Sequence, residues 1–180
     1  MPQIRSSKDN RAKKAVGIIR YFRRLNDQPY RLTVSGAWAA SRPSHLLNFF
    51  TRINLSDYRL FVDLGSGDGI ACCMAGLFTK SIGIESDPFL LSLASRAARD
   101  LELDDRVGFI RADFQTQAIR NADCLYIYPN RPVYKLEEIL AGWSGTLLIY
   151  GPHFPPRRFS RRETLRCGRE MMTTYFDPCA

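Results

Sequence analysis

The segment from Phe61 to Ile70, Phe-Val-Asp-Leu-Gly-Ser-Gly-Asp-Gly-Ile, constrains the fold more than any other part of the sequence. An apolar run gives way to three glycines at alternate positions, and a helix-like segment follows at residues 71–79. This order predicts a buried strand, a tight turn and the N-terminus of a helix, where backbone N–H groups point at a ligand.

The spacing Gly65-x-Gly67-x-Gly69 differs from the Gly-x-Gly-x-x-Gly turn that cradles the pyrophosphate of a dinucleotide. It also places Asp63 at the end of the strand and Asp68 inside the turn. Two carboxylates there repel a pyrophosphate, but they suit a ligand that brings an ammonium or sulfonium group close to the glycines. S-adenosylmethionine is such a ligand.

The next predicted strand, Ser81–Glu85, ends in an acid, and the one after it, Val107–Ala112, is followed by Asp113. Glu85 is expected to accept hydrogen bonds from both ribose hydroxyls, as acids do in other Rossmann-like sites. Asp113 is expected to accept from the adenine amino group, with Phe114 packed beside the ring. The alternative is a doubly wound domain whose strand-end acids have no ligand.

In these motifs the chain resembles class I S-adenosylmethionine-dependent methyltransferases. Asp63–Gly69 is similar to their first motif, Gly83–Pro88 to the second and Arg111–Phe114 to the third, and the resemblance extends from Val34 to Phe176. The cofactor-binding residues that it implies, together with the reasoning above, are Asp63, Gly65, Ser66, Gly67, Asp68, Gly69, Glu85, Ser86, Asp113 and Phe114.

Within that class the chain looks most like the small archaeal and mitochondrial-type protein lysine methyltransferases. The matches are the full Asp-Leu-Gly-Ser-Gly-Asp-Gly motif, the Gly-x-Glu-x-Asp-Pro motif and Phe154-Pro155 after the fifth predicted strand. Trp38-Ala-Ala-Ser41 only echoes the Tyr/Phe-Val-Pro-Thr/Ser element of that group. This departure bears on the substrate more than on the cofactor.

The rest of the pattern alternates strands with helices, which predicts a Rossmann-like, doubly wound seven-strand sheet that is mostly parallel. A C-terminal antiparallel hairpin is expected to complete it. The expected strands are the one before Gly65, Ser81–Glu85, Val107–Ala112, Asp123–Tyr128, Gly145–Tyr150, Thr164–Cys167 and Met171–Phe176. The expected helices are Arg11–Leu25, Pro43–Arg52, Ala71–Thr79, Pro88–Leu101 and Val133–Ala141, with Val34–Ala40 as a loop.

The methyl acceptor is expected to enter where the fourth strand ends, at Tyr126, Tyr128, Pro129 and Asn130. Planar nitrogen acceptors are held in related enzymes by Asn/Asp-Pro-Pro-Tyr/Phe, and this chain has Tyr128-Pro-Asn-Arg131 instead. An aromatic wall suits an amine through cation–π contact. Trp38, in the loop that the resemblance places over the cofactor, is the second candidate for lining the acceptor site. For Tyr128 and Trp38, packing in the core is the alternative.

Charge is divided unevenly along the chain, whose net charge is +8. Residues 1–31 carry +7, residues 32–156 carry −2 and residues 157–180 carry +3. The expected organisation is therefore a basic, amphipathic helical extension at residues 1–33 and a methyltransferase domain at residues 34–180. Basic ends attract nucleic acid, anionic lipid or an acidic protein surface, although a solvated face without a partner is the open alternative.

Five cysteines lack any Cys-x-x-Cys pair, and three of them lie in apolar segments. Reduced thiols in a cytoplasmic protein are therefore expected. The two histidines have no metal-ligand spacing with the cysteines, so no metal is expected, and glycines and prolines interrupt the longest uncharged run, so no membrane span is expected. Peripheral membrane contact through the basic helix stays open.

Three hypotheses on function follow. The first is methyl transfer to a lysine amine of a protein, which a narrow apolar channel would favour by keeping the amine neutral. The second is methyl transfer by the same fold to RNA or a small metabolite, favoured if the basic ends bind nucleic acid. The third is a non-catalytic binding module, against which the complete set of glycines and strand-end acids argues.

Overall fold

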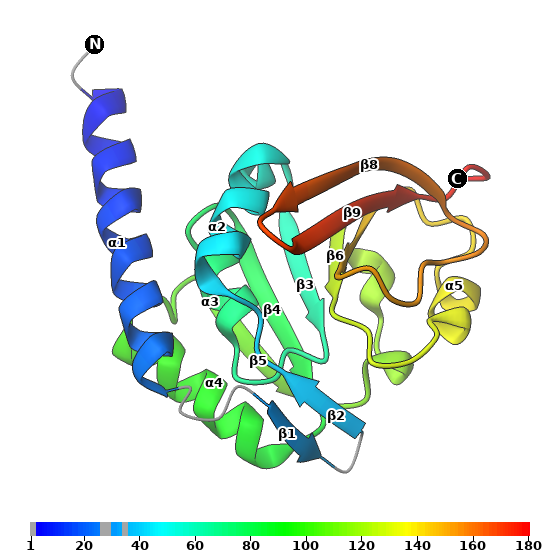
Figure 1. The fold of residues 1–180 in the computed structure, drawn as a ribbon, viewed down its shortest axis with the longest axis horizontal. Coiled ribbons are helices and arrows are strands. Elements are labelled where there is room, and N and C mark those ends of the chain that lie inside the picture. The colour runs from blue at the N-terminus through cyan, green and yellow to red at the C-terminus, as the bar shows by residue number, and fades with distance from the viewer. Residues whose placement is uncertain (1–2, 26–29, 34–35) are drawn as a thin grey trace.

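The computed structural model describes residues 3–25, 30–33 and 36–180. Its centre is a seven-stranded sheet in the order β5-β4-β3-β6-β7-β9-β8 (Figure 1). The strands are β3 (Leu60–Leu64), β4 (Lys80–Glu85), β5 (Val107–Arg111), β6 (Cys124–Ile127), β7 (Thr146–Tyr150), β8 (Ser160–Cys167) and β9 (Glu170–Phe176). The first five run parallel, whereas β9 is antiparallel to both β7 and β8. The predicted mostly parallel sheet with a C-terminal antiparallel hairpin is confirmed.

Helices cover both faces of this sheet. They are α1 (Gln3–Leu25), α2 (Pro43–Arg52), α3 (Ile70–Ala75), α4 (Pro88–Asp100) and α5 (Tyr134–Ile139), with 3-10 turns η1 (Leu55–Asp57), η2 (Phe114–Thr116) and η3 (Ile119–Asn121). The buried apolar side chains of α1, α2 and α3, together with Ala97 and Ala98 of α4, belong to one apolar cluster, and those of α5 and η3 belong to a second.

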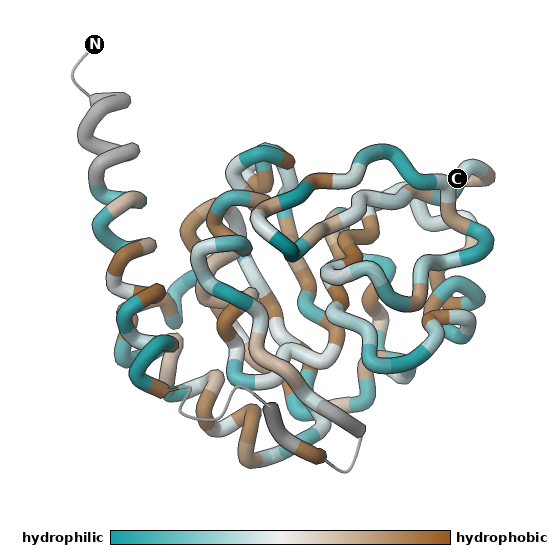
Figure 2. Tube along the Cα trace, viewed as in Figure 1, coloured by the Kyte–Doolittle hydropathy of each residue, from teal (hydrophilic) through white to brown (hydrophobic). Residues whose placement is uncertain are grey.

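Alternate residues along the central strands feed these two clusters, because successive side chains in a strand point to opposite faces. In β6, Cys124 and Tyr126 belong to the first cluster, whereas Leu125 and Ile127 belong to the second. A continuous apolar run is therefore what a strand covered on both faces requires. Figure 2 shows this hydrophobic character along the central strands, whereas the loop before β8 is largely hydrophilic.

The N-terminal helix α1 begins at Gln3 and is therefore longer than the predicted Arg11–Leu25. Its inner stripe, Ala15, Ile18 and Phe22, is buried in the first cluster, and the Tyr21 hydroxyl donates a hydrogen bond to the Asp100 carboxylate of α4 at 2.7 Å. Helical spacing of these apolar residues explains why the helix packs on the domain. Its first half extends beyond the body of the molecule (Figure 1).

The prediction of a loop over Val34–Ala40 is wrong in its described part. Strands β1 (Tyr30–Thr33) and β2 (Gly36–Ala39) form a small antiparallel sheet, while residues 34–35 lie outside the described part. Gly-Ala-Trp-Ala has no apolar–polar alternation, so the strand has no periodic signal in the sequence. None of the helices that the structure describes combines the length and apolar character needed to cross a bilayer.

Candidate functional site

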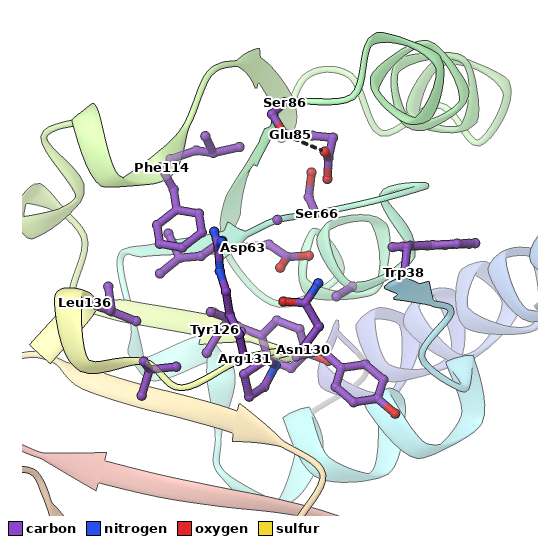
Figure 3. Close-up of a pocket in the computed structure, with 18 of the residues that line it drawn as sticks. Trp38, Asp63, Ser66, Glu85, Ser86, Phe114, Tyr126, Asn130, Arg131 and Leu136 are labelled. Carbon is purple, nitrogen blue, oxygen red and sulfur yellow. Dashed lines mark hydrogen bonds between the residues drawn. The ribbon is translucent and has the colours of Figure 1, made fainter. Parts of the chain in front are cut away.

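The carboxyl ends of β3, β4, β5 and β6 meet at one edge of the sheet. From β3 the chain proceeds outward through β4 and β5, and it then crosses back to place β6 on the other side of β3. A crevice forms where the strand order reverses in this way, and ligands of open α/β sheets bind there. A cavity of about 480 Å³ opens at this point (Figure 3).

Most of the predicted site residues line this cavity. They are Trp38, Asp63, Gly65, Ser66, Asp68, Glu85, Ser86, Asp113, Phe114 and Tyr128. Gly67 and Gly69 belong to the turn behind them. The structure thus brings together residues that the chain separates by as much as 90 positions.

Two turn glycines have conformations and neighbours that exclude a side chain. Gly67 has φ +55°, and a Cβ there would overlap the indole of Trp38. Gly69 has φ +84°, precedes α3, and a Cβ there would stand 2.7 Å from Ala94 and Phe109 side-chain atoms. L-residues rarely adopt such φ values, so glycine is required on both counts.

Glu85 ties the glycine turn to the start of α4. Its Oε2 accepts a hydrogen bond from the Gly67 N–H and its Oε1 one from the Asp87 N–H, both at 2.8 Å. The Ser86 hydroxyl donates to Oε1 at the longer distance of 3.4 Å. Glu85 is 7% exposed and lines the cavity, and Oε2, which accepts one of these hydrogen bonds, has a second lone pair for a ligand donor.

Asp63 lies at the end of β3 and is buried. Burial raises the pKa of this carboxyl well above its usual value, and the negative charges of Glu85 and Asp68 raise the pKa further. The Cys72 thiol, whose Sγ lies 3.8 Å from Oδ2, opposes these effects by donating a hydrogen bond. A cation in the cavity would favour the ionised carboxylate, since opposite charges attract strongly where water is excluded.

Ser66 has a buried hydroxyl oxygen without a hydrogen-bond partner among the described residues. It lines the cavity, and Figure 3 shows it between Glu85 and Asp63. A buried polar atom without a partner is costly, which makes this oxygen a candidate ligand contact.

Asp113 and Phe114 follow β5 and also line the cavity. Asp113 is exposed, and its carboxylate holds the η2 turn by accepting a hydrogen bond from the Gln115 N–H at 2.9 Å.

The two aromatic residues expected beside the acceptor lie in different settings. Tyr128 is 38% exposed at the cavity mouth, with its ring 4.9 Å from that of the buried Tyr150. Trp38 contacts Gly67 and so covers the turn rather than the end of β6. Tyr126 is buried, and its hydroxyl lies 3.0 Å from the Ser41 hydroxyl.

Sequence reasoning missed Arg131 as a member of the site. Its side chain extends from the loop after β6 across the cavity toward Phe114 and Asp63 (Figure 3). The available signal was that Arg131 replaces the aromatic residue of the Asn-Pro-Pro-Tyr/Phe pattern at the same strand end. Lys135 of α5 also lines the cavity, so two cations accompany its acids.

Several solved structures share this fold at low sequence identity. An RNA methyltransferase from Salinibacter ruber, in complex with S-adenosyl-L-homocysteine, aligns with TM-score 0.66 at 22% identity over 77% of this chain and 95% of its own. A methyltransferase from Geobacter sulfurreducens aligns with TM-score 0.63 at 18% identity over 91% of this chain and 88% of its own.

The B. subtilis m1A22 tRNA methyltransferase TrmK aligns with TM-score 0.55 at 14% identity, over 73% of this chain and 64% of its own. No protein-family model and no curated protein matches the sequence. Together with the strand order and the C-terminal hairpin, these similarities show that the chain has the Rossmann-like fold of seven-strand methyltransferases.

Proposed function

We propose that this protein is an S-adenosylmethionine-dependent methyltransferase. The observation that carries the proposal is that acids from the ends of β3, β4 and β5 line one cavity together with the glycine turn. Known methyltransferases among the structural neighbours support it, and one of them is described as a complex with the demethylated cofactor.

The residues present fit the cofactor. Ser66 offers a buried hydroxyl oxygen that lacks a partner in the described structure. Asp63 stands where burial and neighbouring acids disfavour an anion, so a cationic ligand would relieve that electrostatic cost. In this proposal Glu85 accepts from the ribose hydroxyls, while Asp113 and Phe114 hold the adenine.

Bound there, the cofactor would supply a methyl group on a sulfonium, which is already activated for transfer. The protein then has to hold donor and acceptor in line, and orientation of this kind provides much of the rate. The acceptor would approach past Tyr128 and Arg131 at the cavity mouth. Solvent is kept from the inner end by buried Tyr126 and Ser41.

For the acceptor, RNA fits the site better than a protein lysine. Arg131 and Lys135 line the cavity, and their positive charges repel an approaching ammonium group but attract phosphate. Two of the structural neighbours are RNA methyltransferases, which agrees with this choice. The observation that favours lysine is Tyr128, whose exposed ring could contact an amine.

Cofactor binding is tested by thermal shift with S-adenosylhomocysteine and, in parallel, NAD. S-adenosylhomocysteine should raise the unfolding temperature, and NAD should not, because Asp63 and Asp68 stand where a pyrophosphate would lie. At about 100 times the dissociation constant, a ligand stabilises by about 2.7 kcal/mol. Stabilisation by NAD alone would overturn the proposal.

The acceptor class is tested by radiolabelled methyl transfer to a host lysate. Label that survives protease and disappears with RNase supports an RNA acceptor. Label that survives RNase and disappears with protease supports the lysine hypothesis, and label in small molecules supports a metabolite. A Glu85→Ala protein serves as the control for transfer by a contaminating enzyme.

A further inference from the structure

We propose that single-stranded RNA docks on a basic rim beside the cavity mouth, formed by the loop after β6 with α5 and by the loop before β8. The inference rests on the proposed methyl transfer to RNA. The rim consists of Arg131, Tyr134, Lys135, Phe154, Arg157 and Arg158.

Charge on the rim has one sign. Residues 128–136 and 151–162 hold six lysines and arginines and no aspartate or glutamate. The next acid along the first segment, Glu137, is buried and accepts hydrogen bonds from the Arg157 and Arg158 backbone N–H groups at 2.7 and 2.6 Å. Its carboxylate is therefore satisfied by backbone N–H groups rather than by either guanidinium group. The pKa of exposed Asp177 is lowered by hydrogen bonds from the Cys179 and Gly142 N–H groups and, to a lesser extent, by the positive charge of Arg158.

Aromatic rings accompany these cations. Tyr134 is 42% exposed and Phe154 is 36% exposed, and both rank among the few large apolar side chains that the described surface exposes. The Arg157 guanidinium lies 4.3 Å from the centroid of the Tyr134 ring. Basic side chains that meet phosphates, interleaved with rings on which bases stack, are what proteins use to bind single strands.

The backbone of the rim is held in place before any ligand arrives. Prolines at 129, 132, 152, 155 and 156 restrict both loops, and Glu137 fastens the second loop to α5. A surface with little freedom to lose binds more tightly for the same contacts.

The other basic surface of the molecule is less suitable. Helix α1 packs beside α4, on the opposite side of the body from α5 (Figure 1). RNA bound only there would not pass the cavity mouth, whereas the rim shares Arg131, Lys135 and Phe154 with the cavity lining. The rim therefore satisfies both the charge and the access that an RNA acceptor needs.

Two charge variants of the full chain test the proposal. The rim variant is Arg157→Gln/Arg158→Gln, two exposed cations outside the cavity lining, and the matched control is Lys13→Gln/Lys14→Gln, two exposed cations of α1. Each lowers the net charge by the same amount. Binding of a fluorescent single-stranded RNA of about 20 nucleotides is measured by anisotropy, with S-adenosylhomocysteine present, at several salt concentrations.

The rim variant should lose affinity by about tenfold, and its slope of log affinity against log salt should fall by about 1.4, because about 0.7 is lost per phosphate contact with a single strand. The α1 control should stay within about twofold of the wild type. A third variant, Tyr134→Leu, removes a ring that lies outside the cavity lining and should lose about fivefold with an unchanged salt slope, since stacking releases no counterions.

Equal losses in the rim and α1 variants, or a loss in the α1 variant alone, would overturn the proposal. Unfolding temperature and S-adenosylhomocysteine affinity are measured on each protein, and neither should change. If the wild type binds S-adenosylhomocysteine but not RNA, the docking proposal fails while the cofactor proposal stands. If S-adenosylhomocysteine does not bind at all, the proposed function itself fails.

Discussion

At the scale of single residues, Glu85 holds the glycine turn through one carboxylate oxygen and the start of α4 through the other. Glu85→Ala should weaken S-adenosylhomocysteine binding by about 2–4 kcal/mol, because the ribose hydroxyls would lose their acceptor in a buried place. Calorimetric titration measures this loss. Asp105→Ala is the control and should leave the affinity unchanged, since it removes an exposed acid that lies outside the cavity lining. Unchanged affinity in a folded Glu85→Ala protein would defeat the ribose assignment.

Asp63 predicts an unusual dependence of stability on pH. Its folded-state pKa is raised, so the folded chain retains a proton that the unfolded chain releases, and the free energy of unfolding falls as the pH rises from the ordinary value of 3.8 toward the folded value. Asp63→Asn removes the ionisable group. The variant should therefore be more stable than the wild type at pH 8, by about 1–3 kcal/mol, and the difference should shrink at pH 5.

Urea denaturation at the two pH values measures the Asp63 effect, with the exposed Asp104→Asn as control. A difference that is the same at both pH values would contradict the argument. The more stable Asp63→Asn protein should also bind S-adenosylhomocysteine more weakly, because the negative charge available to the ligand's ammonium group is gone.

At the scale of elements, the loop between β7 and β8 depends on one buried carboxylate of α5. Glu137→Ala leaves the backbone N–H groups of Arg157 and Arg158 without their acceptor and should destabilise the protein by about 2–4 kcal/mol. Amide hydrogen exchange should rise in residues 152–159 before it rises in β7. Both N–H groups donate to the same oxygen, Oε1, so Glu137→Gln can keep both hydrogen bonds at its amide oxygen and should show a clearly smaller effect. The neighbouring exposed Glu138→Ala is the matched control, and equal exchange in both variants would contradict the role given to Glu137.

The same scale shows what the sequence could and could not predict. Five parallel strands and the hairpin were predictable, because apolar runs ending at glycines or acids recur at short intervals. Strand β8 begins at Ser160, four residues before the predicted start. The sequence did not reveal this first part of the strand, because it is rich in arginine and lacks an apolar face. The role of Glu137 was not predictable, since nothing in the local sequence distinguishes this buried glutamate, which accepts hydrogen bonds from a distant loop, from the exposed Glu138 beside it. The reach of Arg131 into the cavity likewise depends on side-chain conformation rather than on sequence spacing.

At the scale of the whole molecule, α1 attaches to the domain through its second half. Removing residues 1–10 leaves the buried Ala15, Ile18 and Phe22 in place. The shortened protein should therefore unfold within about 2 °C of the full chain and should bind S-adenosylhomocysteine equally well. Phe22→Ala in the full chain is the contrasting variant and should cost about 3–5 kcal/mol, because it leaves a cavity in the core. Differential scanning calorimetry and titration measure both effects, and lost cofactor binding in the shortened protein would show that α1 supports the site.

The order of the last strands has a consequence for synthesis. β9 follows β8 in the chain but lies between β7 and β8 in the sheet. While a ribosome adds residues one by one, β7 emerges with one side already paired to β6 and the other side open, and its five residues are apolar or weakly polar. Unpaired, apolar strand edges recruit other strands. Until residue 176 has left the exit tunnel the nascent chain therefore exposes an unpaired strand edge at its centre, and its yield in cells should depend on chaperones that shield such edges during elongation.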